Sequence, residues 1–172
     1  MLLLSNNLRG KIQFPKDAVV RVNSAWVKTE KDLQEILTKN YDRDVFLDFP
    51  SGRTKPPQPT LTLMQLLQAI RLNKNVKYFA VSNAEDEEQL ENIKHLIGEV
   101  ELVPKIETIV GVGNIRKIVK ASGCKIVMLD VEDLYVDCDA DTKIYESKYN
   151  QLYVKCKELG VKVIRLCGVA FE

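Results

Sequence analysis

Two apolar segments in the middle of the chain end in charged residues whose types and spacing could do chemistry. The first segment, 103–107, reads VPKIE, and the second, 125–129, is followed directly by Asp130, Glu132 and Asp133. Side chains alternate between the faces of a strand, so Lys105 and Glu107 share one face. Buried parallel strands are normally apolar on both faces. This Lys and this Glu must therefore pair with each other, reach water or hold a polar ligand.

The position of these charges in their elements favours a ligand site. An amphipathic helix with Ile115, Ile118 and Val119 on one face joins the two strands and stops at Ser122-Gly123. In open sheets and (β/α) barrels, ligands bind at the carboxyl edge of parallel strands. An alternative is that each carboxylate caps the helix that follows it. For Lys105 the alternative is an ion pair with Glu107 within the strand.

The composition is that of an ordinary globular protein, and we expect one domain over residues 1–172. Hydrophobic residues make up 45% of the chain, and 25 Lys+Arg against 24 Asp+Glu give a net charge of +1, so no field draws it to nucleic acid or membrane. The apolar opening, residues 1–4, is too short for a signal peptide or a spanning helix. The cysteines form no C-x-x-C pair, and we expect free thiols, with only Cys138 exposed, in a cytoplasmic protein.

Strand and helix patterns alternate along the whole chain. The expected strands cover Lys11–Phe14 (weak), Ala18–Val22, Asp44–Phe49, Lys77–Ser82, Glu101–Glu107, Lys125–Leu129 and Val161–Leu166. Polar residues at strand ends, namely Arg21, Asp48, Ser82, Glu107 and Asp133, recur at intervals of 27, 34, 25 and 26, the length of one βα unit. This regularity predicts an α/β fold, a TIM-type (β/α) barrel that is incomplete or truncated, with six to seven parallel strands. An open parallel edge is a liability in water, so we expect a homo-oligomer.

Several short motifs occur in the order found in a known superfamily. PKIETIVGVGNIRKIV followed by IVMLDVEDLYVD resembles the strand–helix–strand of the phosphoenolpyruvate/pyruvate-binding (β/α) barrels. The K-I-E strand is similar to pyruvate kinase, and the I-E-T strand with the E-D-L strand end to the citrate lyase β-chain and the 2-oxo-acid aldolases. VVRVNSAWVKTEKDL, DVFLDFPSGRTKPP and YFAVSNAEDEEQL resemble further segments of these families. The match covers roughly residues 18–168.

The resemblance implies roles for particular residues. Glu107 and Asp133 would hold Mg²⁺ or Mn²⁺, Lys105 would lie beside the enolate or phosphoryl group, and Arg21 would grip a substrate carboxylate or phosphate. Asp130 and Glu132 are rivals to Asp133, because a one-residue shift of the strand end changes which acid points inward.

The strand that carries Arg21 supplies the rest of the expected substrate-binding set. Asn23 shares a face with Arg21, and Asp48 ends the neighbouring strand, where it would also be the nearest partner for Arg21. An Arg inside an apolar barrel needs an anion.

The resemblance implies a lyase or aldolase that acts on a 2-oxo acid, phosphoenolpyruvate or an acyl-CoA through a metal-stabilised enolate. Two alternatives stay open. One is a degenerate barrel that binds a partner or metabolite without turnover, favoured by the missing strand and by Phe49 and Cys167 in place of pyruvate-kinase threonines. The other is pyruvate-kinase-like phosphoryl transfer, which needs a nucleotide site that the sequence does not display.

Overall fold

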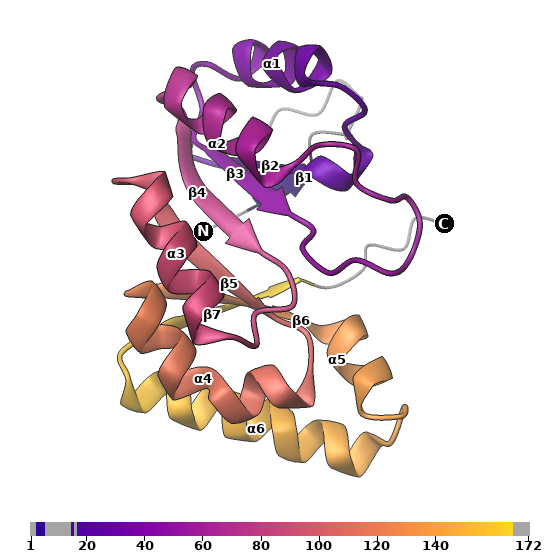
Figure 1. Cartoon of the computed structure of the whole chain (residues 1–172). Helices are drawn as coiled ribbons and strands as arrows, with labels where there is room; N and C mark the ends of the chain where they lie inside the picture. The colour runs from indigo at the N-terminus through magenta and orange to yellow at the C-terminus, as the bar shows by residue number, and fades with distance from the viewer. Residues whose placement is uncertain (1–2, 6–14, 16, 167–172) are drawn as a thin grey trace. The chain divides into compact units, whose positions relative to one another are not determined.

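The computed structural model describes residues 3–5, 15 and 17–166, and these fall into two compact units. Unit 1 comprises residues 1–80 and 96–101, and unit 2 comprises residues 81–95 and 102–172. Strands and helices alternate along both units (Figure 1).

Unit 1 is built on the strand order β1-β2-β3-β4. Its strands are β1 (Leu3–Ser5), β2 (Val19–Asn23), β3 (Val45–Phe49) and most of β4 (Val76–Val81). β2 pairs in parallel with β1 on one side and with β3 on the other, which brings Asn23 opposite Asp48. The helical elements are the short η1 (Ser24–Trp26), α1 (Glu30–Lys39) and α2 (Leu63–Leu72). The sheet of unit 1 therefore ends in polar side chains at the carboxyl edge of neighbouring strands.

The helices of unit 1 start where the sequence supplies capping boxes. Thr29 accepts a hydrogen bond from the Asp32 backbone at the start of α1, and Thr62 does the same from Gln65 at the start of α2. In each box the side chain at the third helical position bonds back to the cap, so two orphan donors are satisfied together. A reciprocal amide pair between Gln34 and Asn73 then ties α1 to α2.

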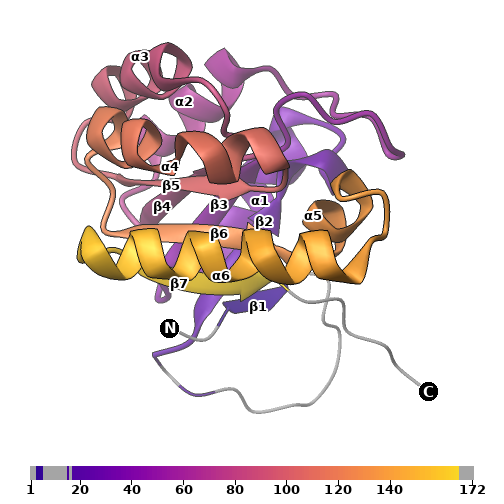
Figure 2. The same ribbon diagram turned by 90° about the horizontal axis from the view of Figure 1, so that it is seen from below.

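Unit 2 is built on the strand order β5-β6-β7. Its strands are β5 (Glu101–Ile106, whose first residue belongs to unit 1), β6 (Ile126–Asp130) and β7 (Lys162–Leu166), and both neighbouring pairs are parallel. Its helices are α3 (Glu87–Ile97, whose last two residues belong to unit 1), α4 (Ile109–Ser122), α5 (Val131–Asp137) and α6 (Thr142–Glu158). α4 and α6 lie side by side (Figures 1 and 2). Lys105 is in register with Met128, so the ends of β5 and β6 lie together.

The strands are the buried core, as a parallel sheet covered by helices requires. Val45 to Leu47 on β3, Val103 on β5 and Val127 to Leu129 on β6 are fully inaccessible to solvent. Repeated strand–helix units of this kind make an α/β fold, an incomplete TIM-type barrel, and this confirms the fold class expected from the sequence.

The structure differs from the sequence-based expectations at the first strand, after β6 and at Cys138. The first strand expected from the sequence, 11–14, lies outside the described residues, and so does Cys167; the described first strand is instead β1, at residues 3–5. The acids after β6 begin α5, a helix that was not among the elements expected from the sequence. Cys138 was expected to be exposed, and this was wrong: it follows α5 directly and is only 2% exposed.

Within the part of the chain that the structure describes, no helix combines the length and the apolar character that crossing a bilayer requires.

Candidate functional site

The carboxyl end of β5 places a buried ion pair at the edge of the sheet of unit 2. Lys105 Nζ lies 2.9 Å from Glu107 Oε1 and donates a hydrogen bond of 3.0 Å to Ser82 Oγ. The side chains of Lys105 and Glu107 are only 6% and 5% exposed. A buried ammonium is costly unless it is paired and hydrogen-bonded. The pairing that the sequence left open as an alternative role for Lys105 is therefore present.

The end of β6 brings two further carboxylates to the same place. Asp130 caps α5 by accepting a hydrogen bond from the Asp133 backbone N–H, and its Oδ2 lies 3.9 Å from Lys105 Nζ. Glu107, Asp130 and Asp133 each offer an oxygen, and these oxygens all lie within 4.8 Å of one another. We call these three residues the acidic triad.

The loop after β4 holds Glu107 from the other side. Asn83 adopts a left-handed backbone conformation, with φ of 50°, and its N–H donates a hydrogen bond of 2.6 Å to Glu107 Oε2. The next residue, Ala84, donates its N–H to the Lys105 carbonyl at 3.1 Å. A non-glycine residue with positive φ costs conformational energy and is found mostly where the surrounding structure requires it. Here it places a backbone donor on a buried carboxylate.

The electrostatics of the acidic triad favour a cation. Burial raises the pKa of Glu107 above its usual value, and Asp130 adds to the rise, while Lys105 and the Asn83 hydrogen bond oppose it. With all groups ionised, three carboxylates and one ammonium leave two negative charges. A divalent cation would balance this charge, and hard oxygen donors are what Mg²⁺ prefers. The residues present therefore fit a Mg²⁺ or Mn²⁺ ion.

Only one of these acids caps a helix, although the sequence left capping open as an alternative role for each of them. Thr108, and not Glu107, caps α4 by accepting the Gly111 N–H. At α5 the cap is Asp130, which leaves Asp133 in the first turn, where its carboxylate joins the triad. Glu132, the third acid considered for this site, is exposed and lines a separate pocket on α5.

The expected substrate-binding residues of unit 1 form a cluster of their own. Arg21 Nη2 pairs with Asp48 Oδ2, and the side chains are 16% and 1% exposed. Ser24 Oγ donates a hydrogen bond of 2.9 Å to the Asp48 carbonyl, and Asn23 Oδ1 accepts one of 3.1 Å from Ala25 N to cap η1. Arg21 thus has the ion-pair partner that the sequence indicated, and Asn23 performs a structural task.

Sequence reasoning did not assign a site role to Ser82 or Asn83. Ser82 was noted only as a polar strand end, yet it accepts a hydrogen bond from Lys105. Asn83 is among the residues that most readily adopt a positive φ, and an Asn directly after a buried strand was the signal for a tight turn at this edge. Their roles depend on long-range contacts, which no local pattern reveals.

Comparison with known proteins gives a fold and no closer relative. No family model and no curated protein matches the sequence. The crystal structure of an HpcH/HpaI aldolase from Desulfitobacterium hafniense DCB-2 superposes with a TM-score of 0.70, at 14% identity, over 88% of this chain and 69% of the aldolase. Citrate synthase SbnG gives 0.55 at 14% identity, over 87% of this chain and 76% of the synthase. A variant of SbnG gives 0.56 at 15% identity, over the same shares.

The motifs in residues 18–168 resembled the phosphoenolpyruvate/pyruvate-binding barrels. The proteins in these crystal structures are enzymes of that kind. The likeness is confined to three-dimensional structure, since the identities are low. The chain therefore has the fold of the HpcH/HpaI aldolase and SbnG barrels.

Proposed function

We propose that this protein is a Mg²⁺- or Mn²⁺-dependent carbon–carbon lyase or aldolase that acts on a small 2-oxo acid or an acyl-CoA. The observation that carries the proposal is the acidic triad: three carboxylate oxygens within 4.8 Å of one another at the carboxyl ends of β5 and β6, in a chain with the fold of an aldolase. Active sites of (β/α) barrels are built at that edge.

Each residue of this site has a distinct task in the proposal. Glu107, Asp130 and Asp133 would hold the ion, and Lys105 would place its ammonium beside the negative charge that develops on the substrate. When bound, the ion would act as a Lewis acid that draws electron density from the substrate carbonyl. Ser82 and the Asn83 N–H orient Lys105 and Glu107, and burial of both side chains keeps water from weakening these interactions.

For Arg21 we propose that the guanidinium binds a carboxylate or phosphate of the substrate. Its Nε is buried without a hydrogen-bond partner among the described residues, and Asp48 holds the guanidinium in place from one side. We place Asn23 and Asp48 in the substrate-binding set with it, and Asp48 also positions Arg21.

The direct test is calorimetric titration of Mg²⁺ in the presence of oxalate, which mimics a planar, negatively charged 2-oxo acid. We expect oxalate to tighten Mg²⁺ binding to the wild type. We expect the Glu107→Gln and Asp130→Asn variants to lose Mg²⁺ binding. Glu132→Gln is the matched control, because Glu132 follows the same strand but lies outside the triad. Equal Mg²⁺ affinity in the wild type and in Glu107→Gln would refute the proposal.

The short contact between Lys105 and Glu107 favours a second candidate, a barrel that binds an anionic metabolite without turnover. In that case the ammonium, and not a metal, is the positive partner of Glu107. Oxalate binding that is independent of Mg²⁺ but is lost in Lys105→Met would support this candidate over the first. Phosphoryl transfer like that of pyruvate kinase would need turnover to depend on ATP or ADP.

A further inference from the structure

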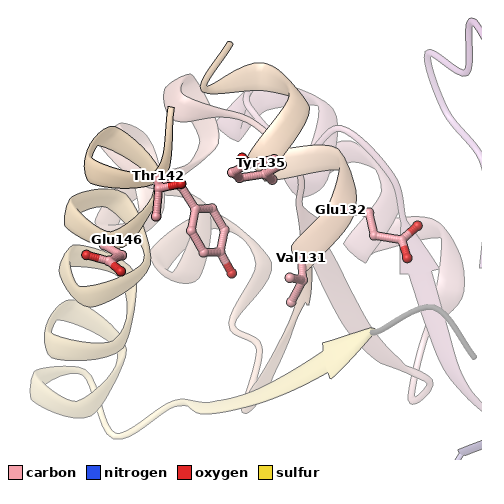
Figure 3. A pocket seen from close by; sticks show the side chains of 6 residues that line it. Val131, Glu132, Tyr135, Thr142 and Glu146 are labelled. Atoms are coloured by element: carbon pink, nitrogen blue, oxygen red, sulfur yellow. The ribbon is translucent and has the colours of Figure 1, made fainter. Parts of the chain in front are cut away.

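A pocket of about 320 Å³ lies in unit 2, between α5 and α6. Figure 3 shows α5 and α6 as its two walls, with Val131 and Tyr135 on one side and Thr142 on the other. Its lining residues are Val131, Glu132, Tyr135, Thr142, Tyr145 and Glu146. The volume is that of a pocket for a small organic molecule.

Two tyrosine rings form a corner of this pocket. The rings of Tyr135 and Tyr145 meet edge to face, with centroids 5.6 Å apart and planes at 83°. The face of an aromatic ring is electron-rich, and rings set at an angle to each other are the arrangement that recognises ammonium groups such as choline or methyl-lysine. Further along α6, the ring of Tyr149 packs against that of Tyr153 outside the pocket lining, with centroids 4.7 Å apart and planes tilted by 32°.

The charge around the pocket is strongly negative. Residues 131–146 contain six acids and a single base, Lys143. Two of the acids, Glu132 and Glu146, line the pocket itself and lie on opposite sides of it (Figure 3). An apolar, aromatic interior flanked by carboxylates suits a ligand with an apolar body and a positive charge.

The pocket is separate from the acidic triad. Asp133 is two residues from both Val131 and Tyr135, so it projects about 160° away from each around the axis of α5. α5 therefore presents one side to the triad and the opposite side to the pocket. Binding at the pocket does not depend on a metal at the triad.

We propose that this pocket binds an organic ammonium group, with Tyr135 and Tyr145 contacting the cation and Glu132 and Glu146 supplying the negative field. Neither the fold nor the proposed lyase activity requires such a site, so it is a second ligand site on the molecule.

The experiment is an NMR titration of the full chain, without metal, with choline and with 3,3-dimethylbutan-1-ol, which has the same shape and no charge. We expect choline to shift the ring resonances of Tyr135 and Tyr145 and to bind about tenfold more tightly than the alcohol. Equal binding of the two compounds would show an ordinary apolar pocket and overturn the proposal. So would shifts confined to other parts of the chain, or no binding of choline at all.

Substitutions of the tyrosines distinguish the contribution of the aromatic ring face to choline binding from that of side-chain size. Tyr145→Leu should weaken choline binding about tenfold and leave the alcohol unaffected, whereas Tyr145→Phe, which keeps the ring, should bind choline as the wild type does. Tyr153→Leu is the matched control on the same helix, and it should leave the affinities for choline and for the alcohol unchanged. If Tyr145→Leu does not fold, Glu146→Gln tests the field on its own: unchanged choline affinity in Glu146→Gln would remove the role of that carboxylate.

Discussion

Lys105 is the residue on which the charge balance of the candidate site depends. Its ammonium lies 2.9 Å from Glu107 and 3.9 Å from Asp130, in a place nearly closed to water. Removing one partner of a buried ion pair leaves the other charge uncompensated, and that is far more costly than losing an exposed pair. A bound divalent cation would supply the missing positive charge.

We therefore expect Lys105→Met to lower the free energy of unfolding by about 3–5 kcal/mol in metal-free buffer. Adding Mg²⁺ should restore part of the loss, so that Mg²⁺ stabilises the variant more than it stabilises the wild type. Urea unfolding with and without Mg²⁺ measures both effects.

Lys117→Met is the control for this experiment. Lys117 lies 3.7 Å from Glu87, and both side chains are at least half exposed, so its loss should change stability by less than about 1 kcal/mol. A Lys105→Met variant that gains no more from Mg²⁺ than the wild type does would speak against a metal at the triad.

The buried carboxyl of Glu107 makes stability depend on pH. Burial raises the pKa of Glu107 in the folded chain, so the folded state binds a proton more tightly than the unfolded state. Protonated Glu107 therefore stabilises the folded state. This contribution is complete at pH values below the pKa of Glu107 in the unfolded chain, and it is lost as pH rises through the pKa of Glu107 in the folded chain. We expect Glu107→Gln to lack this loss, so the stability of the variant relative to the wild type should increase with pH. Unfolding of both proteins without metal, between about pH 4 and pH 8, measures the difference.

At the scale of single residues the sequence located the charged strand ends but not the contacts that their side chains make. Lys105 and Glu107 follow from the pleat of one strand, and the structure brings them into contact. The second strand end offered three acids, of which the resemblance favoured Asp133, but helix phase decides which of them point inward. The triad contains Asp130 and Asp133, while Glu132 lies on the pocket side.

The N-terminus of α4 packs closely against the loop after β4, and Gly111 makes this possible. A Cβ built at Gly111 would lie 2.9 Å from the Ala84 carbonyl oxygen, whereas one built at Gly113 would meet nothing within 4 Å. Asn83, which holds Glu107, directly precedes Ala84. This one glycine therefore affects both the packing of α4 and the position of the candidate site.

We expect Gly111→Ala to destabilise the protein by about 1–3 kcal/mol through overpacking and to weaken Mg²⁺ binding by moving the loop. Gly113→Ala should instead stabilise it by about 0.5–1 kcal/mol, because alanine is the better helix former. Thermal unfolding and Mg²⁺ titration of the two variants test the contrast, and similar behaviour of both would contradict it.

Most helices could be predicted from sequence because their ends carry caps. Thr29 and Thr62 begin α1 and α2 as the pattern of cap and periodic apolar residues indicates. α5 was missed because seven residues are too few to show helical periodicity. Its signal was the cap: Asp130 accepts a hydrogen bond from Asp133 three residues on, a spacing typical of helix starts.

At the scale of the whole molecule, the alternation of strands and helices was predictable because each strand is a short apolar run closed by turn residues. The first strand was not, since three residues at 3–5 carry too little pattern. Among the described strands, β7 stands last in the strand order of its unit. β7 is also less buried than the other strands of unit 2, with Val163 and Ile164 half-buried.

No described strand of unit 2 pairs with the side of β7 that faces away from β6. We expect this edge to mediate self-association, because a parallel edge with apolar side chains favours pairing with another chain. Sedimentation velocity over a range of concentrations should show an oligomer, and Ile164→Lys should shift the population towards monomer. Circular dichroism would check that the variant is folded. A wild type that sediments as a monomer at every concentration would rule out this role for β7.

The anchoring of Glu107 has a consequence for ion selectivity. One of its oxygens faces the Lys105 ammonium and the other accepts the Asn83 N–H, so the carboxylate cannot turn freely or chelate through both oxygens. Ca²⁺ takes six to eight oxygen ligands, often including a bidentate carboxylate. Mg²⁺ is coordinated octahedrally, usually by one or two carboxylates and several waters. A donor fixed in this way discriminates by ionic radius and disfavours the larger ion.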